Sequence, residues 1–129
     1  MQPVDAVAML AVIQFLVFGS LVGKARGQYG VKAPAVSGSE HFERIYRVQM
    51  NTLELLVAFL PALYAAGHYW PGWVVAGVGA VYLVGRVVYW RAYVRAPATR
   101  GLGFVLSIAP VFGLAVATLV PALLGKPTL

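Results

Sequence analysis

The chain has 129 residues, 60% of them hydrophobic and 11% charged, and its mean hydropathy of +0.79 predicts an integral membrane protein. Cysteine is absent, which excludes a disulfide framework, a thiolate metal site and a cysteine nucleophile. The net charge of +6 does not indicate nucleic-acid binding, because no soluble basic domain remains once the apolar segments are set aside.

The first apolar segment predicts a membrane-spanning helix over about residues 4–24. Residues 6–23, AVAMLAVIQFLVFGSLVG, carry no charge and are long enough to cross roughly 30 Å of hydrocarbon. A cleaved signal peptide is the alternative, but the preceding MQPVD has no positive charge and no soluble domain follows. The next stretch, KARGQYGVKAPAVSGSEH, is polar and rich in Gly, Pro and Ser, and it indicates the first loop.

Three further spans follow in the sequence. Helix two is predicted over about 40–67, with Ser39 as its N-cap, and the aromatic turn HYWPGW follows it. Helix three is predicted over about 72–95 and helix four over about 101–124, with the loop APATRG between them. We therefore expect an all-α integral membrane fold, a bundle of four transmembrane helices in one domain over residues 1–129.

The basic residues indicate how this bundle is oriented. In a four-span chain, nine of the ten fall on the side of the first and third loops, and only Lys126 lies opposite. The excess of Lys and Arg in cytoplasmic loops predicts that both loops are cytoplasmic and that both termini point away from the cytoplasm. The nine residues are Lys24, Arg26, Lys32, Arg44, Arg47, Arg86, Arg91, Arg95 and Arg100.

Residues 42–55, FERIYRVQMNTLEL, place polar side chains at the start of a hydrophobic segment. On an α-helix, Arg47, Asn51 and Glu54 stand at i, i+4 and i+7, within a stripe roughly 60° wide, so they can face one neighbour. A carboxylate inside a membrane segment is costly unless it meets a cation. One interpretation is therefore structural: an Arg47–Glu54 pair that fixes packing, with Asn51 as an interhelical hydrogen bond.

Helix three carries a second polar stripe, because Arg86, Tyr89 and Tyr93 are spaced i, i+3 and i+7. Tyrosines near a membrane interface most often form an aromatic belt. Taken with the first stripe, and with Arg26 and Arg100 at adjoining helix ends, they predict a cationic pocket with one carboxylate, two phenols and an amide. Such a pocket suits a small ligand with several acidic groups and one ammonium, because arginines hold carboxylates and the glutamate holds the amine.

Two segments, FERIYRVQMNTLE and RVVYWRAYVRAPATR, resemble at their observed separation the MAPEG family, the membrane-associated proteins in eicosanoid and glutathione metabolism. That family includes microsomal glutathione transferases and leukotriene C4 synthase, and the likeness covers most of the chain. It implies a homotrimer that binds glutathione, as co-substrate and without a metal, at a subunit interface. It also implies a membrane-bound glutathione transferase acting on lipophilic electrophiles, with glutathione-dependent peroxidase activity as a second use of the same thiolate.

The resemblance implies a role for each polar residue of the two stripes. Arg47, Asn51 and Glu54 look like the residues that hold the γ-glutamyl end of glutathione. Tyr89 and Tyr93 look like those that line the peptide from helix three.

Three more positions have counterparts in the family. Arg26 and Gln49 resemble groups that reach in from the neighbouring subunit, and Arg100 looks like the arginine that stabilises the glutathione thiolate. A thiol has a pKa of about 8.5, and a guanidinium beside the sulfur favours the anion, which is the nucleophile.

Three departures separate the chain from the eicosanoid branch of the family. Leu55 stands where that branch has an aromatic residue, Val57 where it has a proline and Gly27 where it has a second arginine. These differences point away from leukotriene synthesis but leave the glutathione-binding residues in place. The NTLE segment looks more like a bacterial member of the family, which would lie in the inner membrane.

Two alternatives from other functional classes remain. One is a non-catalytic scaffold or lipid-binding protein of the same fold, against which the retention of Arg100 and of the helix-two residues argues. The other is a small four-helix exporter that couples protons to cation export through Glu54, a mechanism that predicts few cations near that carboxylate.

Overall fold

The computed structural model describes all 129 residues as four long helices and one short 3-10 helix, with no strand. Each of the four long helices is long and apolar enough to cross a membrane. The all-α fold of four membrane helices predicted from the sequence is therefore confirmed. The elements are α1 (Gln2–Tyr29), α2 (Glu40–Ala66), α3 (Gly72–Arg95), η1 (Pro97–Thr99) and α4 (Gly101–Leu123).

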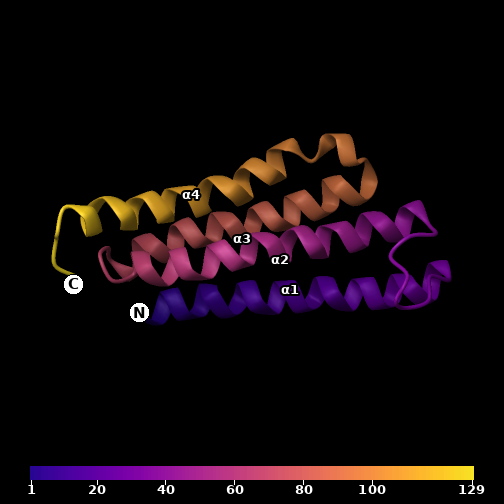
Figure 1. The fold of residues 1–129 in the computed structure, drawn as a ribbon, viewed down its shortest axis with the longest axis horizontal. Coiled ribbons are helices and arrows are strands. Elements are labelled where there is room, and N and C mark those ends of the chain that lie inside the picture. The colour runs from indigo at the N-terminus through magenta and orange to yellow at the C-terminus, as the bar shows by residue number, and fades with distance from the viewer.

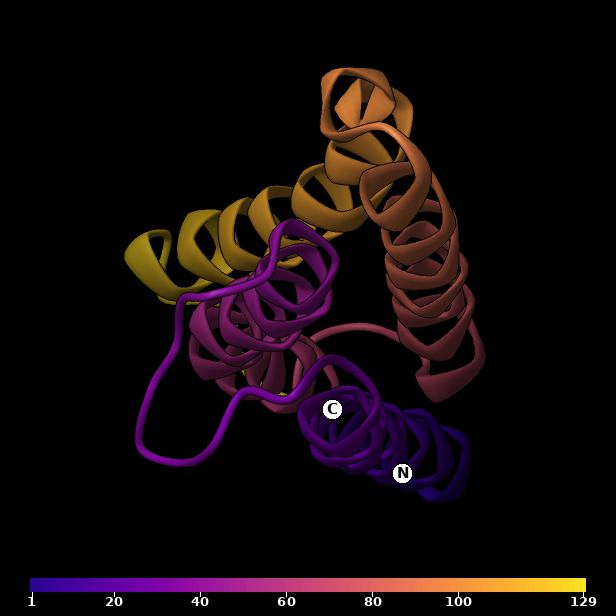
Figure 2. The same cartoon turned by 90° about the vertical axis from the view of Figure 1, so that its right-hand side faces the viewer.

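The helices run antiparallel to their chain neighbours, and α1 and α4 lie on opposite sides of the α2–α3 pair (Figure 2). Both termini and the α2–α3 turn lie at one end of the bundle, which we call the terminal end (Figure 1). The α1–α2 loop and η1 lie at the other end, which we call the loop end. Because the two basic loops meet there, the bundle gathers most of its positive charge at the loop end.

Helix α1 is longer than its apolar run, so the prediction that it ends at residue 24 was wrong. It continues to Tyr29, where Gly30 ends it in the left-handed conformation with φ 68°. The Val31 N–H then donates to the Arg26 carbonyl at 3.1 Å, the bond expected of a glycine-terminated helix. Val31 is also buried in a small apolar cluster with residues of α1 and α2. The glycine cap and this packing together keep the polar residues 24–29 in the helix.

Helix α2 begins at its predicted N-cap. Ser39 has an extended backbone and its hydroxyl accepts a hydrogen bond from the Phe42 N–H at 3.4 Å. Glu40 and Glu43 occupy the first turn, where negative charge is favourable to the helix dipole. Pro61 lies inside α2 without ending it, as membrane helices tolerate.

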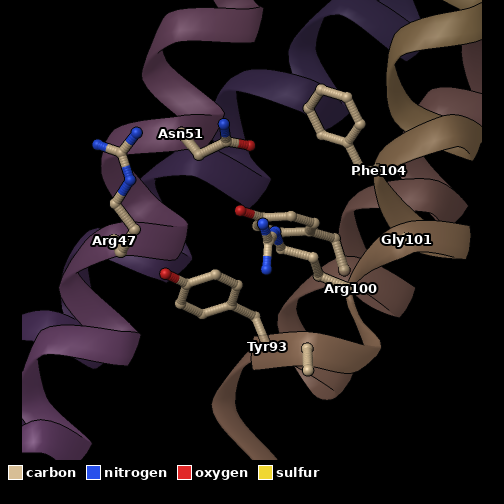
Figure 3. A pocket seen from close by; sticks show the side chains of 8 residues that line it. Arg47, Asn51, Tyr93, Arg100, Gly101 and Phe104 are labelled. Carbon is tan, nitrogen blue, oxygen red and sulfur yellow. The ribbon is translucent and has the colours of Figure 1, made fainter. Parts of the chain in front are cut away.

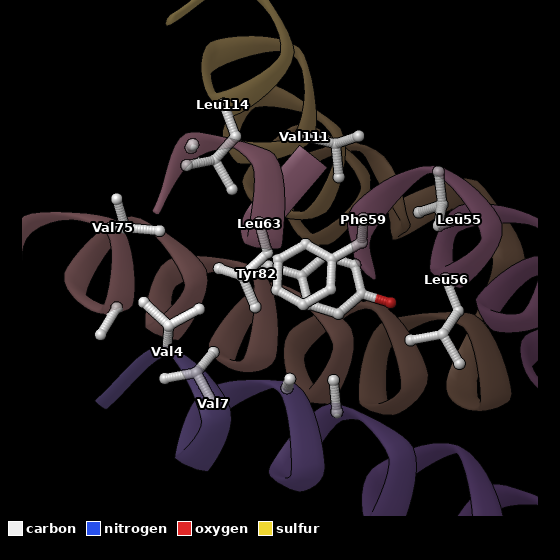
Figure 4. Close-up of a cluster of buried hydrophobic side chains, with 14 residues drawn as sticks. Val4, Val7, Leu55, Leu56, Phe59, Leu63, Val75, Tyr82, Val111 and Leu114 are labelled. Carbon is white, nitrogen blue, oxygen red and sulfur yellow. The ribbon is translucent and has the colours of Figure 1, made fainter. Parts of the chain in front are cut away.

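The apolar core lies toward the terminal end and receives side chains from all four helices (Figure 4). At its centre the rings of Phe59 and Tyr82 stack, with centroids 3.8 Å apart and planes 11° apart. Val4, Leu63 and Leu114 are buried in the same cluster from three different helices. Interdigitated aliphatic and aromatic side chains therefore hold this end together.

Two glycines let α3 and α4 approach each other closely at the loop end. A Cβ at Gly85 would lie 2.6 Å from the Leu106 carbonyl carbon, and one at Gly103 would overlap the backbone of Tyr89. Small residues at helix contacts are a common device in membranes, where no hydrophobic effect drives helices together. The contact holds the start of α4, and with it Arg100, beside Tyr89.

Candidate functional site

A cavity of about 630 Å³ opens at the loop end between α2, α3, η1 and α4 (Figure 3). It brings together the two polar stripes that helical spacing predicts, because five of its lining residues are sequence-predicted site residues. Asn51 from α2 and Tyr93 and Arg100 from the opposite wall are directed into the same space. The lining consists of Arg47, Asn51, Tyr89, Tyr93, Ala98, Arg100, Gly101 and Phe104.

Glu54 lies just outside this lining, in an ion pair with Arg47. The Nη1 atom of Arg47 is 3.3 Å from Oε1 of Glu54, and the two side chains are 52% and 56% exposed. Figure 3 shows the Arg47 guanidinium turned away from Tyr93 and Arg100. The ion pair that the structural interpretation of the sequence requires is thus present, and it stands at the border of the cavity.

Arg26 and Gln49 do not join the other site residues within one chain. The Nη1 of Arg26 donates to the Ala35 carbonyl at 2.7 Å, and its guanidinium lies over the Phe42 ring at 5.0 Å. Gln49 faces α1, since a Cβ at Gly19 would lie 2.7 Å from its amide nitrogen. Their reach into the site of a neighbouring subunit stays a prediction.

Behind the cavity, Arg86 is fully buried and organises a polar network between three helices. Its Nε donates to Ser107 Oγ at 2.9 Å, and its Nη1 donates to Asn51 Oδ1 at 2.8 Å and to Thr52 Oγ1 at 3.1 Å. The guanidinium also lies over the Tyr89 ring, 4.4 Å from the centroid. Asn51 therefore makes the interhelical hydrogen bond of the structural interpretation while it also lines the cavity.

Sequence reasoning placed Arg86 in the polar stripe of helix three but not among the site residues. The spacing of Arg86 and Tyr89, at i and i+3, is the feature of the sequence that indicates that Arg86 lies near the site. Its bond to Ser107 could not be read, because a lone serine in an apolar helix carries no spacing that identifies a partner on another helix.

The wall formed by η1 and α4 is held by hydrogen bonds to the C-cap residue of α3 and to η1 itself. The Thr99 hydroxyl is within 2.7 Å of the Ala96 carbonyl, and Arg100 Nη1 donates to the Pro97 carbonyl at 2.9 Å. Arg100 is exposed and is the N-cap residue of α4, whose first turn has no side-chain cap. The free N–H groups near Gly101 add to the positive potential of the guanidinium.

A second cavity, of about 350 Å³, adjoins the first and shares Arg47 and Tyr93 with it. Arg44 stands at its wall, where it pairs with Glu40 and donates from Nη1 to the Arg95 carbonyl at 3.2 Å. It thereby joins the start of α2 to the end of α3 and stabilises the rim of the larger cavity.

The chemistry of the larger cavity favours an anion with several acceptor oxygens. Its lining contains two guanidinium groups, two phenols and one amide, and no carboxylate. Guanidinium groups bind carboxylates in a forked geometry, and phenols and amides donate further hydrogen bonds. Phe104 gives the α4 side of the cavity an apolar surface next to Arg100.

Residues 4–120 match the model of the MAPEG family, and this match covers most of the chain. The chain belongs to the MAPEG family. This MAPEG chain is 41% identical over 118 residues to microsomal glutathione S-transferase 2 of Homo sapiens, covering 92% of the chain and 78% of that protein. It is 36% identical over 102 residues to leukotriene C4 synthase of Cavia porcellus, covering 74% and 68%. An uncharacterized protein of Synechocystis is 45% identical over 100 residues, covering 78% and 73%.

Proposed function

We propose that this MAPEG protein is a membrane-bound glutathione transferase. The observation that carries the proposal is the cavity lined by guanidinium groups, phenols and an amide without a carboxylate. Glutathione offers two carboxylates and two peptide carbonyls to such donors. The identity of 41% to a microsomal glutathione S-transferase supports the same ligand, and a volume of about 630 Å³ suits a small-molecule site.

The γ-glutamyl end of glutathione is a zwitterion, and the Arg47–Glu54 pair at the cavity border has the complementary charges. In our proposal Arg47 binds the α-carboxylate and Glu54 binds the α-ammonium. Asn51, Tyr89 and Tyr93 donate hydrogen bonds to oxygen atoms along the peptide. The half exposure of Arg47 and Glu54 leaves both groups accessible to an incoming ligand.

Arg100 stabilises the thiolate in this proposal. A free thiol with a pKa of about 8.5 is mostly protonated at neutral pH, and each unit by which that pKa falls raises the ratio of thiolate to thiol about tenfold. Arginine stays charged, so Arg100 acts by electrostatics and the thiol proton leaves to solvent. The free N–H groups at the start of α4 favour the same anion.

The transfer step then needs no further reagent. The sulfur electron pair forms a bond to the electrophilic carbon, while the bond from that carbon to its leaving group breaks. The leaving group departs with the bonding electrons and takes a proton from water. The apolar side chain of Phe104 beside Arg100 favours a lipophilic electrophile.

We further propose that the protein is a homotrimer in a bacterial inner membrane, with both basic loops in the cytoplasm and both termini on the other side. Arg26 and Gln49 lie on the α1 side of the chain and would complete the cavity of a neighbouring subunit. The charge at the loop end supports the orientation. Crosslinking in native membranes tests the trimer, and labelling of a Ser37→Cys variant from either side of the membrane tests the topology, because Ser37 is exposed in the α1–α2 loop.

Titration of the detergent-solubilised protein with glutathione tests the function. We expect saturable binding with an ultraviolet thiolate band, and we expect Arg100→Ala to bind glutathione while its thiolate fraction at neutral pH falls about tenfold. Arg95→Ala is the matched control, because Arg95 has the same charge, is exposed and does not line the cavity. No binding at millimolar glutathione would exclude the transferase, and binding without a thiolate band would favour the scaffold alternative.

A further inference from the structure

Arg86 is a buried cation without a carboxylate partner. It is fully buried in α3, and its hydrogen-bond acceptors are the side chains of Ser107, Asn51 and Thr52, all of them neutral. A charge inside a membrane bundle is costly and is seldom retained for packing alone. Its Nη2 atom is also buried and has no hydrogen-bond partner, so the network does not optimise stability.

The hydroxyl groups of the network have fixed directions. Ser107 donates to the Gly103 carbonyl at 2.6 Å, and Thr52 donates to the Val48 carbonyl at 2.7 Å. Each hydroxyl has one hydrogen, so after these backbone bonds both oxygens can only accept. Arg86 therefore meets fixed acceptors on α2 and α4, and its guanidinium cannot rotate without losing them.

This arrangement also fixes the amide of Asn51. A guanidinium only donates, so the atom of Asn51 that lies 2.8 Å from Arg86 must be the carbonyl oxygen, Oδ1. Asn51 also lines the cavity, and because Arg86 binds its carbonyl oxygen, the amide nitrogen is the group of this side chain that is left to donate to a ligand. We propose that Arg86 is a positioning residue that binds the carbonyl oxygen of Asn51 and so leaves the amide nitrogen as the group that Asn51 offers to the ligand.

The consequence is a rule for which part of the ligand can lie against Asn51. An amide nitrogen held toward the ligand donates to a carboxylate or a peptide carbonyl, whereas an ammonium group placed there would meet N–H donors. The ammonium is then left to Glu54 at the cavity border, so Arg86 sets the direction in which the γ-glutamyl end enters. This inference rests on the proposed binding of glutathione.

A double-mutant cycle measures whether Arg86 acts through Asn51. Glutathione dissociation constants are compared for the unmodified protein, Arg86→Met, Asn51→Ala and the double variant, together with their thermal midpoints. We expect each single change to raise the Kd about tenfold, as loss of one hydrogen bond to a charged group does, and the double variant to show no further increase. A double variant weakened about a hundredfold, the product of the single effects, would overturn the proposal.

Two further variants keep the test decisive if Arg86→Met folds poorly. Asn51→Asp forms an ion pair with Arg86, so we expect an unchanged or higher thermal midpoint but a Kd raised more than in Asn51→Ala, because the donor is replaced by an anion. An unaltered Kd in Asn51→Asp would show that Asn51 donates nothing to glutathione. Leu63→Ala lowers stability from the apolar core, about three turns along α2 from Asn51, and calibrates unspecific effects, so an equal rise in its Kd would make Arg86 merely structural.

The two proposals fail in different ways. If the unmodified protein does not bind glutathione, the proposed function falls and the role of Arg86 toward that ligand falls with it. If the unmodified protein binds glutathione and the cycle is additive, only the role of Arg86 falls.

Discussion

The two ends of the bundle are held together by different means. At the terminal end, Phe59 and Tyr82 stack within a cluster of apolar side chains. At the loop end, Arg86 bonds to side chains of two other helices, and the glycines Gly85 and Gly103 bring α3 and α4 together. The stacked rings at the terminal end lie outside the cavity lining, whereas at the loop end Asn51 belongs both to the network and to the cavity.

This comparison predicts that changes in the apolar core cause the largest loss of stability. They should nevertheless leave glutathione binding unchanged. Phe59→Ala should lower the free energy of unfolding by about 3 kcal/mol, because it removes a fully buried ring and leaves a cavity against Tyr82. Val57→Ala, on the same helix but 70% exposed, should change it by less than about 0.5 kcal/mol. Unfolding in mixed detergent micelles measures both.

The same variants test whether the two ends are independent. The glutathione Kd of folded Phe59→Ala should equal that of the unmodified protein, because Phe59 lies outside the cavity lining. A Kd that rose with the loss of stability would show that the apolar core also sets the geometry of the site.

A change in the close packing at the loop end should lower both the stability and the affinity for glutathione. Gly85→Ala would place a methyl group 2.6 Å from the Leu106 backbone, which cannot rotate aside, so we expect a loss of about 2 kcal/mol. The displaced α4 should also carry Arg100 away from Tyr89 and weaken glutathione binding. Both effects are read from one unfolding series and one titration.

Gly77→Ala is the matched control on the same helix. A Cβ at Gly77 meets nothing within 4 Å, so the change should be neutral or should stabilise α3 by up to about 1 kcal/mol. If Gly85→Ala and Gly77→Ala behaved alike, close approach of α3 and α4 would not be what holds the loop end.

The sequence was sufficient for the features that depend on local periodicity. Apolar length marked the four spans, Ser39 marked the start of α2, and helical spacing grouped Arg47 with Asn51 and Tyr89 with Tyr93. Each of these follows from the pitch of one helix or from the chemistry of one helix end.

Features that depend on contacts between distant segments could not be predicted. The burial of Val31, which supports the glycine-terminated end of α1, depends on packing against Phe42 of α2, and the network of Arg86 depends on Ser107 lying on the facing side of α4. The places of Arg26 and Gln49 relative to the site depend on a second subunit, so their roles are still predictions.

The smallest effect on stability is expected at the exposed border of the loop end. Glu54→Gln breaks the ion pair with Arg47, but because both side chains are about half exposed the free energy of unfolding should fall by at most about 0.5 kcal/mol. Glutathione binding should weaken by about 1 kcal/mol, since the ammonium loses its counter-charge at a partly solvated site.

Glu43→Gln removes the same charge from the same helix outside the larger cavity, and it should leave the glutathione Kd unchanged. Arg47→Gln should weaken binding like Glu54→Gln if the pair receives the two charges of one zwitterion. The relevant comparison is with γ-glutamyl analogues that lack the ammonium group: Glu54→Gln should bind these as well as the unmodified protein does. If Glu54→Gln instead bound glutathione itself with full affinity, the pair would be a structural feature of α2, and the loop end would recognise its ligand by Asn51 and the tyrosines alone.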